Sequence, residues 1–306
     1  LDFRRQRQMC IRDRYYMNNA LLIILITFWK TIILLPRRLQ LILSSLTGFL
    51  LYLAPFKRNK FSKINIHLCF PKMSKNQLNR IYKKNIILSG RVLFDTGIAW
   101  FWSNERIEKN VSYKLNGLNQ LIKVQESGQG VLLFFKHSLH LELDARVLGM
   151  HAEIYGVERE HNSKYFQSVQ KKGRLKGIRD VVDRNNTIRF IKWLKEGKTV
   201  LYAPDQDYGM KKSNEIKFFN QPAATVSAPW KIVNKTLCKT FFLNSYLNNN
   251  QLVIDIEELT LNHLDETNFS ENLNMHIEES IKQHPSEYLW QHRRFKSTLG
   301  KKNLYK

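Results

Sequence analysis

Gly130-Val131-Leu132-Leu133-Phe134-Phe135-Lys136-His137-Ser138-Leu139-His140-Leu141-Glu142-Leu143-Asp144 is the stretch around which this sequence is organised. Its apolar run Val131–Phe135 predicts a strand buried on both faces, because the run is continuous rather than alternating. The polar residues that follow lead into a helical pattern at Leu141, Ala145 and Leu148. Open α/β sheets place their active sites at the carboxyl ends of buried strands. The stretch therefore predicts an α/β fold with polar chemistry after a central strand.

Within this stretch, His137 and Glu142 form an H-x-x-x-x-E motif. The spacing suits a loop imidazole and a carboxylate from the first turn of the next helix. Such a carboxylate can fix the tautomer of the imidazole and stabilise its protonated form. No G-x-S-x-G elbow accompanies the pair, so no serine nucleophile is indicated. We therefore expect a histidine base that activates a substrate hydroxyl directly.

Two other interpretations of the same stretch remain open. His140 and Asp144 form an H-x-x-x-D motif, a second pairing of an imidazole with a carboxylate in the same stretch. His137, His140 and Asp144 also have side chains that can ligate a metal ion. We predict no metal, because neither an H-E-x-x-H motif nor a Cys/His framework supports one.

The composition favours anionic partners. The 306 residues are 43% apolar, enough for one large domain or two small ones, and Lys and Arg (49) exceed Asp and Glu (26) to give a net charge of +23. Nucleic acid, acidic carrier proteins, phosphorylated lipids and membrane surfaces are all attracted by such a charge. No nucleic-acid-binding signature is present, so we predict no nucleic acid partner. Three cysteines without a spacing pattern indicate a reduced, cytosol-facing protein.

The amino-terminal part of the sequence divides into two segments before the main domain. Residues 1–16 do not resemble the start of a native protein, so we expect a non-native leader and a true start at Met17. Residues 17–56 contain the apolar runs Ala20–Leu35 and Leu39–Leu53. The first run would be ~24 Å long as a helix, shorter than the ~30 Å hydrocarbon core of a bilayer. We predict one membrane-anchoring segment plus an interfacial helix, followed by a catalytic domain over residues 57–306.

Further elements of this domain follow from periodicity and breaker residues. The predicted strands are Ala152–Val157 and Lys198–Ala203, with a hairpin formed by Phe241–Leu247 and Leu252–Glu257. The predicted helices cover Asn76–Leu93, Gly117–Glu126, Thr187–Glu196 and Ser270–Gln283.

Three groups of polar residues are candidates for substrate binding. Arg159 and Arg174 follow the strand Ala152–Val157, where guanidinium groups suit phosphate recognition. Asp205 and Asp207 form a D-x-D pair after the strand Lys198–Ala203. Such a pair can hold a divalent metal and a nucleotide sugar, or it can be an Asp-rich turn. Arg293-Arg294 lies in the aromatic and basic segment 288–296, which suits a phosphorylated headgroup or a surface tail.

Several of these segments together resemble one known family. They are Asn65–Pro71, Thr96–Trp102, His137–Arg146, Tyr202–Gly209 with Gln221–Thr225, and Pro285–Lys296. In this order they are similar to the lipid A biosynthesis lauroyl/myristoyl acyltransferases, inner-membrane enzymes of the lysophospholipid acyltransferase superfamily. The resemblance implies a mixed, largely parallel sheet flanked by helices and preceded by a membrane-anchoring segment.

The resemblance also implies a reaction and its partners. A fatty acyl chain would pass from an acyl carrier protein thioester, the co-substrate, to a hydroxyl of a phosphorylated lipid A precursor, without a cofactor. The enzyme would lie at the bacterial inner membrane, near anionic lipids, with its catalytic domain facing the cytoplasm. His137 would be the base and Glu142 its partner. Arg159 and Arg174 match family arginines, although Glu158 and Glu160 replace the tyrosine and proline that flank the first.

Two other classes of protein share part of this pattern. A D-x-D glycosyltransferase at the membrane would require Mn²⁺ or Mg²⁺, and a non-enzymatic basic protein would bind nucleic acid with a steep salt dependence. Neither explains why the five family-like segments occur in one order. We expect the acyltransferase, with Asp205, Asp207, Arg293 and Arg294 near its substrates, and with backbone amides near the strand end stabilising the oxyanion.

Overall fold

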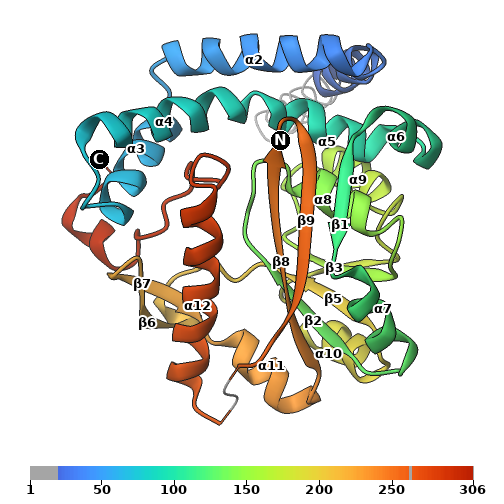
Figure 1. Cartoon of the computed structure of the whole chain (residues 1–306), viewed down its shortest axis with the longest axis vertical. Helices are drawn as coiled ribbons and strands as arrows, with labels where there is room; N and C mark the ends of the chain where they lie inside the picture. Colours follow the sequence, from blue (N-terminus) through green and yellow to red (C-terminus); the bar gives the residue numbers. More distant parts are fainter. Residues whose placement is uncertain (1–19, 262–263, 306) are drawn as a thin grey trace, which may run out of the picture.

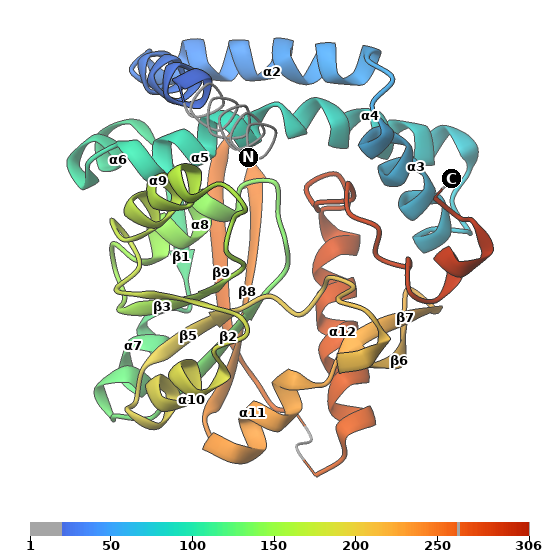
Figure 2. The same ribbon diagram turned by 180° about the vertical axis from the view of Figure 1, so that it is seen from behind.

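The computed structural model describes residues 20–261 and 264–305, and it describes the side chains of all of these except 301 and 302. The expected non-native leader over residues 1–16 and the start at Met17 therefore lie outside the described residues. The chain forms a seven-stranded sheet, a two-stranded hairpin and helices on both faces of the larger sheet (Figures 1 and 2).

The large sheet has the strand order β1-β9-β8-β2-β5-β3-β4. Its strands are β1 (Tyr113–Asn116), β2 (Val131–Phe135), β3 (Ile154–Glu158), β4 (Val181–Asp183), β5 (Thr199–Tyr202), β8 (Lys239–Asn248) and β9 (Gln251–Leu259). All neighbouring pairs are parallel except β8 and β9, which form an antiparallel hairpin. The predicted mixed, largely parallel sheet is therefore confirmed. The separate hairpin consists of β6 (Ser213–Phe218) and β7 (Gln221–Val226).

Helices cover this sheet on both faces (Figure 1). The helices of the described residues are Ala20–Ile33, α2 (Arg37–Leu53), α3 (Lys57–Cys69), α4 (Lys75–Ser89), α5 (Arg91–Phe101), α6 (Asn104–Asn110), α7 (Leu118–Glu126), α8 (Leu141–Leu148), α9 (Lys164–Arg174), α10 (Thr187–Lys195), α11 (Ala228–Thr236) and α12 (Glu266–Gln283), with short 3₁₀ turns at Met210–Lys212 and Leu299–Lys302. The first of these helices and α2 lie instead across one end of the molecule (Figures 1 and 2).

Strand β2 lies at the centre of the core, between β8 and β5. Successive side chains of a strand point to opposite faces, so Leu132 and Phe134 join a core cluster with α10, α11 and α12, whereas Val131 and Leu133 join one with α5, α7 and α8. The first four residues of β2 are fully buried. A continuous apolar run is what a strand covered on both faces requires.

The predicted helix Asn76–Leu93 is interrupted at Gly90 and forms α4 and the start of α5. The break coincides with a close approach of α2. A Cβ at Gly90 would lie 2.1 Å from the Ser44 carbonyl oxygen, and one at Gly48 would lie 1.8 Å from that of Ile87. Glycine at both positions lets the backbones meet directly.

The two amino-terminal apolar runs both form helices, Ala20–Ile33 and α2. Among the described residues, no single helix has the length and apolar composition needed to cross a bilayer. Only α2 and α3 together meet that test, and they are bent by 86°. Membrane anchoring by this segment remains a prediction.

Candidate active site

His137 follows β2 at the carboxyl end of the sheet. Its ring Nδ1 lies 2.6 Å from Asp205 Oδ1, and its backbone N–H donates to Asp205 Oδ2 at 3.0 Å. Both contacts fix the ring and the loop to one carboxylate. The ring Nε2 has no hydrogen-bond partner among the described residues, and the side chain is 17% exposed. A carboxylate at Nδ1 favours a proton there, which leaves Nε2 as an acceptor.

The prediction that Glu142 orients His137 is wrong in this structure, because Asp205 occupies that position. Strands β2 and β5 are parallel neighbours, with Phe134 opposite Tyr202. Residues just beyond the two strand ends therefore meet at one edge of the sheet. Asp205 is fully buried. Burial alone would raise the pKa of its carboxyl, but the charge and hydrogen bonds of His137 outweigh burial and hold that pKa well below its ordinary value.

Glu142 lies in the first turn of α8, as predicted, but its carboxylate meets two other residues. Trp100 Nε1 donates to Oε2 at 2.8 Å, and the Arg174 guanidinium binds both carboxylate oxygens. Burial would raise the pKa of the Glu142 carboxyl, but Arg174 and Trp100 outweigh that effect and lower it. Glu142 is therefore a fixed, ionised carboxylate.

Arg174 lies in the last turn of α9, not directly after a strand as the sequence indicated. Its guanidinium also binds Glu158 Oε2 at 2.5 Å, so two carboxylates share one arginine. Burial would lower the pKa of Arg174, but Glu142 and Glu158 outweigh it and raise that pKa. A guanidinium already neutralised by two carboxylates is poorly suited to phosphate, so the geometry favours a role in holding Glu142.

His140 is surrounded differently from His137. Its Nδ1 lies 2.7 Å from Asp144 Oδ1 and its Nε2 lies 3.3 Å from Glu287 Oε2, and the residue is 2% exposed. Asp144 also accepts hydrogen bonds from the hydroxyls of Ser138 and Ser245. Burial alone would lower the pKa of the His140 imidazole, but Asp144 and Glu287 raise it to about 9. The H-x-x-x-D pair therefore forms a buried ionic network with no free ring nitrogen.

The carboxy-terminal segment encloses the His137 loop. The Leu289 backbone N–H donates to the His137 carbonyl, and the Leu139 N–H donates to the Glu287 carbonyl. The Tyr288 hydroxyl donates to the Asp205 carbonyl at 3.5 Å. Burial lowers the pKa of the neighbouring His292 to about 4, so its imidazole is neutral at pH 7. These contacts explain why the segment 285–296 belongs with the site.

The remaining candidates lie in contrasting surroundings. Arg159 and Arg293 are exposed, and Arg293 lies over the Phe61 ring at 5.8 Å. Arg294 is fully buried and donates to the Ala224 carbonyl at 2.7 Å. The prediction that Arg294 binds a lipid headgroup is therefore wrong, because its guanidinium is inside the protein.

Asp207 has a structural environment. Its oxygens accept hydrogen bonds from the Gly209 backbone and from the backbone and hydroxyl of Ser297. Asp205 and Asp207 thus accept hydrogen bonds from different protein groups, His137 for the first and Gly209 and Ser297 for the second. Among residues 20–261 and 264–305, no group of three His, Cys, Asp or Glu side chains has the arrangement of a metal site. The geometry supports the turn interpretation of D-x-D over the glycosyltransferase one.

Sequence reasoning missed three contributors to the site. These are Asp205 as the partner of His137, Trp100 as a donor to Glu142, and Glu158 as a second partner of Arg174. Trp100 lies in Thr96–Trp102, one of the five family-like segments, for which the sequence indicated no role in the site. Its lone indole N–H was the available signal, because a buried indole donor requires an acceptor.

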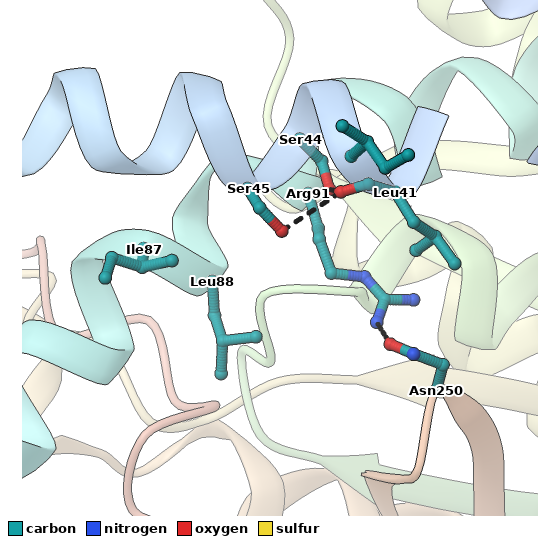
Figure 3. A pocket seen from close by; sticks show the side chains of 8 residues that line it. Leu41, Ser44, Ser45, Ile87, Leu88, Arg91 and Asn250 are labelled. Atoms are coloured by element: carbon teal, nitrogen blue, oxygen red, sulfur yellow. Dashed lines mark hydrogen bonds between the residues drawn. The ribbon is translucent and has the colours of Figure 1, made fainter. Parts of the chain in front are cut away.

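A cleft of about 240 Å³ lies elsewhere, between α2, α4, α5 and the turn of the β8–β9 hairpin. Figure 3 shows Arg91 reaching Asn250 across it, with an N–O distance of 3.0 Å. The residues that line it are Leu41, Ile42, Ser44, Ser45, Ile87, Leu88, Arg91 and Asn250. It contains none of the residues around His137, and we do not assign the chemistry to it.

A central-strand histidine with an oriented ring and an open Nε2 defines an α/β enzyme that can take a proton from a hydroxyl. Comparison with known proteins specifies the class. A family model of bacterial lipid A biosynthesis acyltransferases matches residues 12–297.

Relatives of this chain carry the same description. It is 32% identical over 255 residues to the lipid A biosynthesis palmitoleoyltransferase of Escherichia coli K12, covering 81% of this chain and 82% of the relative. It is 33% identical over 246 residues to the lauroyltransferase of the same organism (79% and 80%), and 32% identical over 256 residues to an acyltransferase of Haemophilus influenzae (80% and 80%). The chain belongs to the bacterial lipid A biosynthesis acyltransferase family, and it is an acyltransferase of that pathway.

Proposed function

We propose that this enzyme transfers a fatty acyl chain from an acyl carrier protein thioester to a hydroxyl of a phosphorylated lipid A precursor, a secondary acylation. The observation that carries the proposal is His137, whose Nδ1 is held by Asp205 while Nε2 remains available. The family membership supports the substrate, and the high positive charge supports both an acidic carrier protein and a phosphorylated acceptor.

In the proposed mechanism, His137 Nε2 takes the proton from the acceptor hydroxyl as its oxygen attacks the thioester carbonyl. A carbon–oxygen bond forms, the carbon–sulfur bond breaks, and the protonated imidazole returns the proton to the departing thiolate. Asp205 stabilises the imidazolium formed in between. A positioned base of this kind typically contributes ~10²–10⁴-fold in rate.

Glu142 remains a catalytic candidate in this proposal, with Asp205 taking over the orienting role. Glu142 is held in the first turn of the helix that follows the His137 loop, and it keeps its charge through Arg174. We propose that Arg174 acts through Glu142 rather than as the primary phosphate ligand. The exposed Arg159 and Arg293 are then the better candidates for binding acceptor phosphates.

Cellular location is part of the same proposal. We propose that the enzyme acts at the inner membrane, facing the cytoplasm, where its lipid acceptor and the soluble carrier protein meet. Anionic membrane lipids would be attracted by the net charge of +23.

Mass spectrometry of lipid A from cells with and without the gene tests the reaction. The expected result is a fixed mass increment equal to one fatty acyl chain, restored by the wild-type gene and not by His137→Ala. An unchanged lipid A profile would contradict the proposal. So would transfer activity abolished by EDTA and restored by Mn²⁺, which would point to the glycosyltransferase alternative.

A further inference from the structure

The segment 286–292, which follows α12, lies between the His137 loop and helices α3 and α4 (Figures 1 and 2). It forms neither a helix nor one of the strands of the two sheets. Tyr288 and Trp290 within it are fully buried. Its backbone polar groups therefore need partners inside the protein, because water does not reach them. The groups that supply those partners determine how firmly the segment is held.

One side of the segment is bound to the His137 loop. The Leu139 N–H donates to the Glu287 carbonyl at 2.8 Å, and the Leu289 N–H donates to the His137 carbonyl at 2.9 Å. The two bonds enclose an isolated antiparallel bridge. The loop that carries the proposed base is therefore fixed by backbone bonds to odd-numbered residues of this segment.

On the opposite side, Asn85 of α4 binds even-numbered residues. Its two amide N–H groups donate to the carbonyls of Ser286 at 2.9 Å and Tyr288 at 2.8 Å. Its Oδ1 accepts hydrogen bonds from the Ser62 hydroxyl at 2.9 Å and from Gln291 Nε2 at 3.0 Å. Asn85 is fully buried, and both donors and both lone pairs of its amide are used. The amide is thus held in a single orientation.

Asn65 of α3 repeats this arrangement further along the segment. Its amide donates to the carbonyls of Trp290 at 2.8 Å and His292 at 2.7 Å, and its Oδ1 accepts from the Tyr305 hydroxyl at 2.6 Å. Asn65 is also fully buried. Each asparagine joins the carbonyls of two alternate residues, as a neighbouring strand would. Asn65 and Asn85 together are called here the asparagine clamp.

Asparagine has the chemistry that this position requires. Two buried carbonyls need two donors, and one primary amide supplies both without a charge. A lysine or arginine would add a buried charge that needs its own partner. The clamp also connects two of the family-like segments, Asn65–Pro71 and Pro285–Lys296, which lie more than 200 residues apart in the chain.

We propose that the asparagine clamp positions His137 for catalysis: it fixes the segment 286–292, and that segment fixes the loop from which the imidazole projects. The inference rests on the function proposed above, in which His137 is the base. Both asparagines are buried, so they act through the histidine rather than on a substrate. A misplacement of about 1 Å between reacting groups can cost ~10²-fold in rate.

Hydrogen–deuterium exchange of the full chain tests the coupling without any substrate. Asn85→Ala removes two donors from the segment. Exchange in the peptides that contain Leu139 and Leu289 should become faster by about tenfold or more, because local opening is easier when buried hydrogen bonds are lost. Unchanged exchange at Leu139 in this variant would overturn the proposal.

Asn59→Ala is the matched control. Asn59 of α3 also donates to two carbonyls, those of Leu51 at 2.7 Å and Ala54 at 3.2 Å, but both lie at the bend between α2 and α3. The control should leave exchange in the Leu139 and Leu289 peptides at the wild-type rate. Equal acceleration by Asn59→Ala and Asn85→Ala would indicate a general loss of stability and would also overturn the proposal.

Two milder variants keep the test decisive if Asn85→Ala does not fold. Ser62→Ala and Tyr305→Phe each remove one hydrogen bond that orients a clamp amide. Each should accelerate exchange in the same two peptides by about twofold or more. Wild-type exchange in both variants would contradict the proposed coupling.

Steady-state kinetics test the consequence for the reaction. Asn65→Ala and Asn85→Ala should lower kcat by about tenfold or more, with KM for the acyl donor and for the acceptor within about twofold of the wild type, because only the position of the base changes. Turnover is normalised to the folded fraction, and Asn59→Ala should retain kcat. A raised KM with unchanged kcat would assign the clamp to substrate binding and overturn the proposal, as would wild-type kcat in a variant whose loop exchanges faster.

Failure of the proposed function has a different signature. A wild-type enzyme that transfers no acyl chain would contradict the function, whereas the exchange experiment would still decide whether the clamp holds the loop. An active wild type whose Leu139 peptide exchanges no faster in Asn85→Ala would leave the function intact and contradict the clamp.

Discussion

His137 and His140 are three residues apart in one loop, yet their surroundings have opposite consequences. His137 has one carboxylate, at Nδ1, and keeps Nε2 without a partner among the described residues. His140 has a carboxylate at each nitrogen and is almost fully buried. With a pKa of about 9, the His140 imidazole carries its proton at pH 7 and cannot act as a base. Whether a histidine of this loop can act as a base is thus decided by how many of its ring nitrogens already have a carboxylate partner, and not by its position in the sequence.

The largest effect should come from removing the proposed base. His137→Ala should lower kcat/KM by ~10²–10⁴-fold, since the acceptor hydroxyl loses its proton acceptor. The variant also leaves the buried Asp205 carboxylate without its ring partner, so the free energy of unfolding should fall by ~1–3 kcal/mol, and turnover is normalised to the folded fraction. Turnover is measured with an acyl carrier protein thioester and a lipid A precursor. Near-normal turnover would remove His137 from the mechanism.

Replacing the orienting carboxylate should be the next most damaging change. Asp205→Asn keeps the size but can present an N–H to Nδ1, favouring the wrong tautomer, and should lower kcat by ~10²-fold or more. Asp207→Asn is the matched control, because the hydrogen bonds of that carboxylate among the described residues go to Gly209 and Ser297 and not to His137. It should retain most of the activity. Equal losses in the two variants would show that the loop, rather than the His137 contact, matters.

The buried histidine should affect stability more than chemistry. His140→Gln leaves Asp144 and Glu287 without their shared cation, and should reduce the free energy of unfolding by ~3–5 kcal/mol. The folded fraction should keep kcat within ~10-fold of the wild type. Urea unfolding and active-site-normalised turnover separate these two effects. A large loss of kcat with unchanged stability would instead favour the H-x-x-x-D interpretation.

The same network predicts a smaller, pH-dependent effect. The pKa of His140 is raised from 6.5 to about 9, so its stabilising contribution is complete below pH 6.5 and is lost as pH rises toward 9. Burial lowers the pKa of the Lys136 ammonium to about 8. Above pH 8 the loss of its proton therefore raises the free energy of unfolding as pH rises, opposite to the effect of His140. Between pH 6.5 and 8, the wild type should lose up to ~1.4 kcal/mol per pH unit, and His140→Gln should show a flatter profile. A wild-type free energy of unfolding that is constant across this window would contradict the charged His140.

The parts of this molecule that were predicted correctly rest on local patterns. Both ends of strand β2 were predicted correctly, because Gly130 precedes its continuous apolar run and Lys136 follows it. The β8–β9 hairpin followed from the asparagines at its turn, two of which adopt positive φ. The helix predicted across Gly90 was interrupted by contact with α2, which no local pattern reports.

The parts that were missed depend on contacts between distant residues. Asp205 is 68 positions from His137, and their meeting requires β2 and β5 to be neighbours. Glu287 is 147 positions from His140. Arg293 and Arg294 look alike in the sequence, yet one is exposed and the other fully buried against β7. Strand order and side-chain direction decide these outcomes, and periodicity alone does not specify them.

The most direct test of the account is a double-mutant cycle between His137 and Asp205. Turnover is compared for His137→Ala, Asp205→Ala and the variant that carries both substitutions. A parallel cycle compares Glu142→Ala alone with the variant that carries both Glu142→Ala and His137→Ala. Residues that act as one unit show strongly non-additive losses. The account predicts that the His137–Asp205 double variant is no slower than His137→Ala alone. Losses that multiply would contradict it, because they would show that Asp205 acts independently of His137.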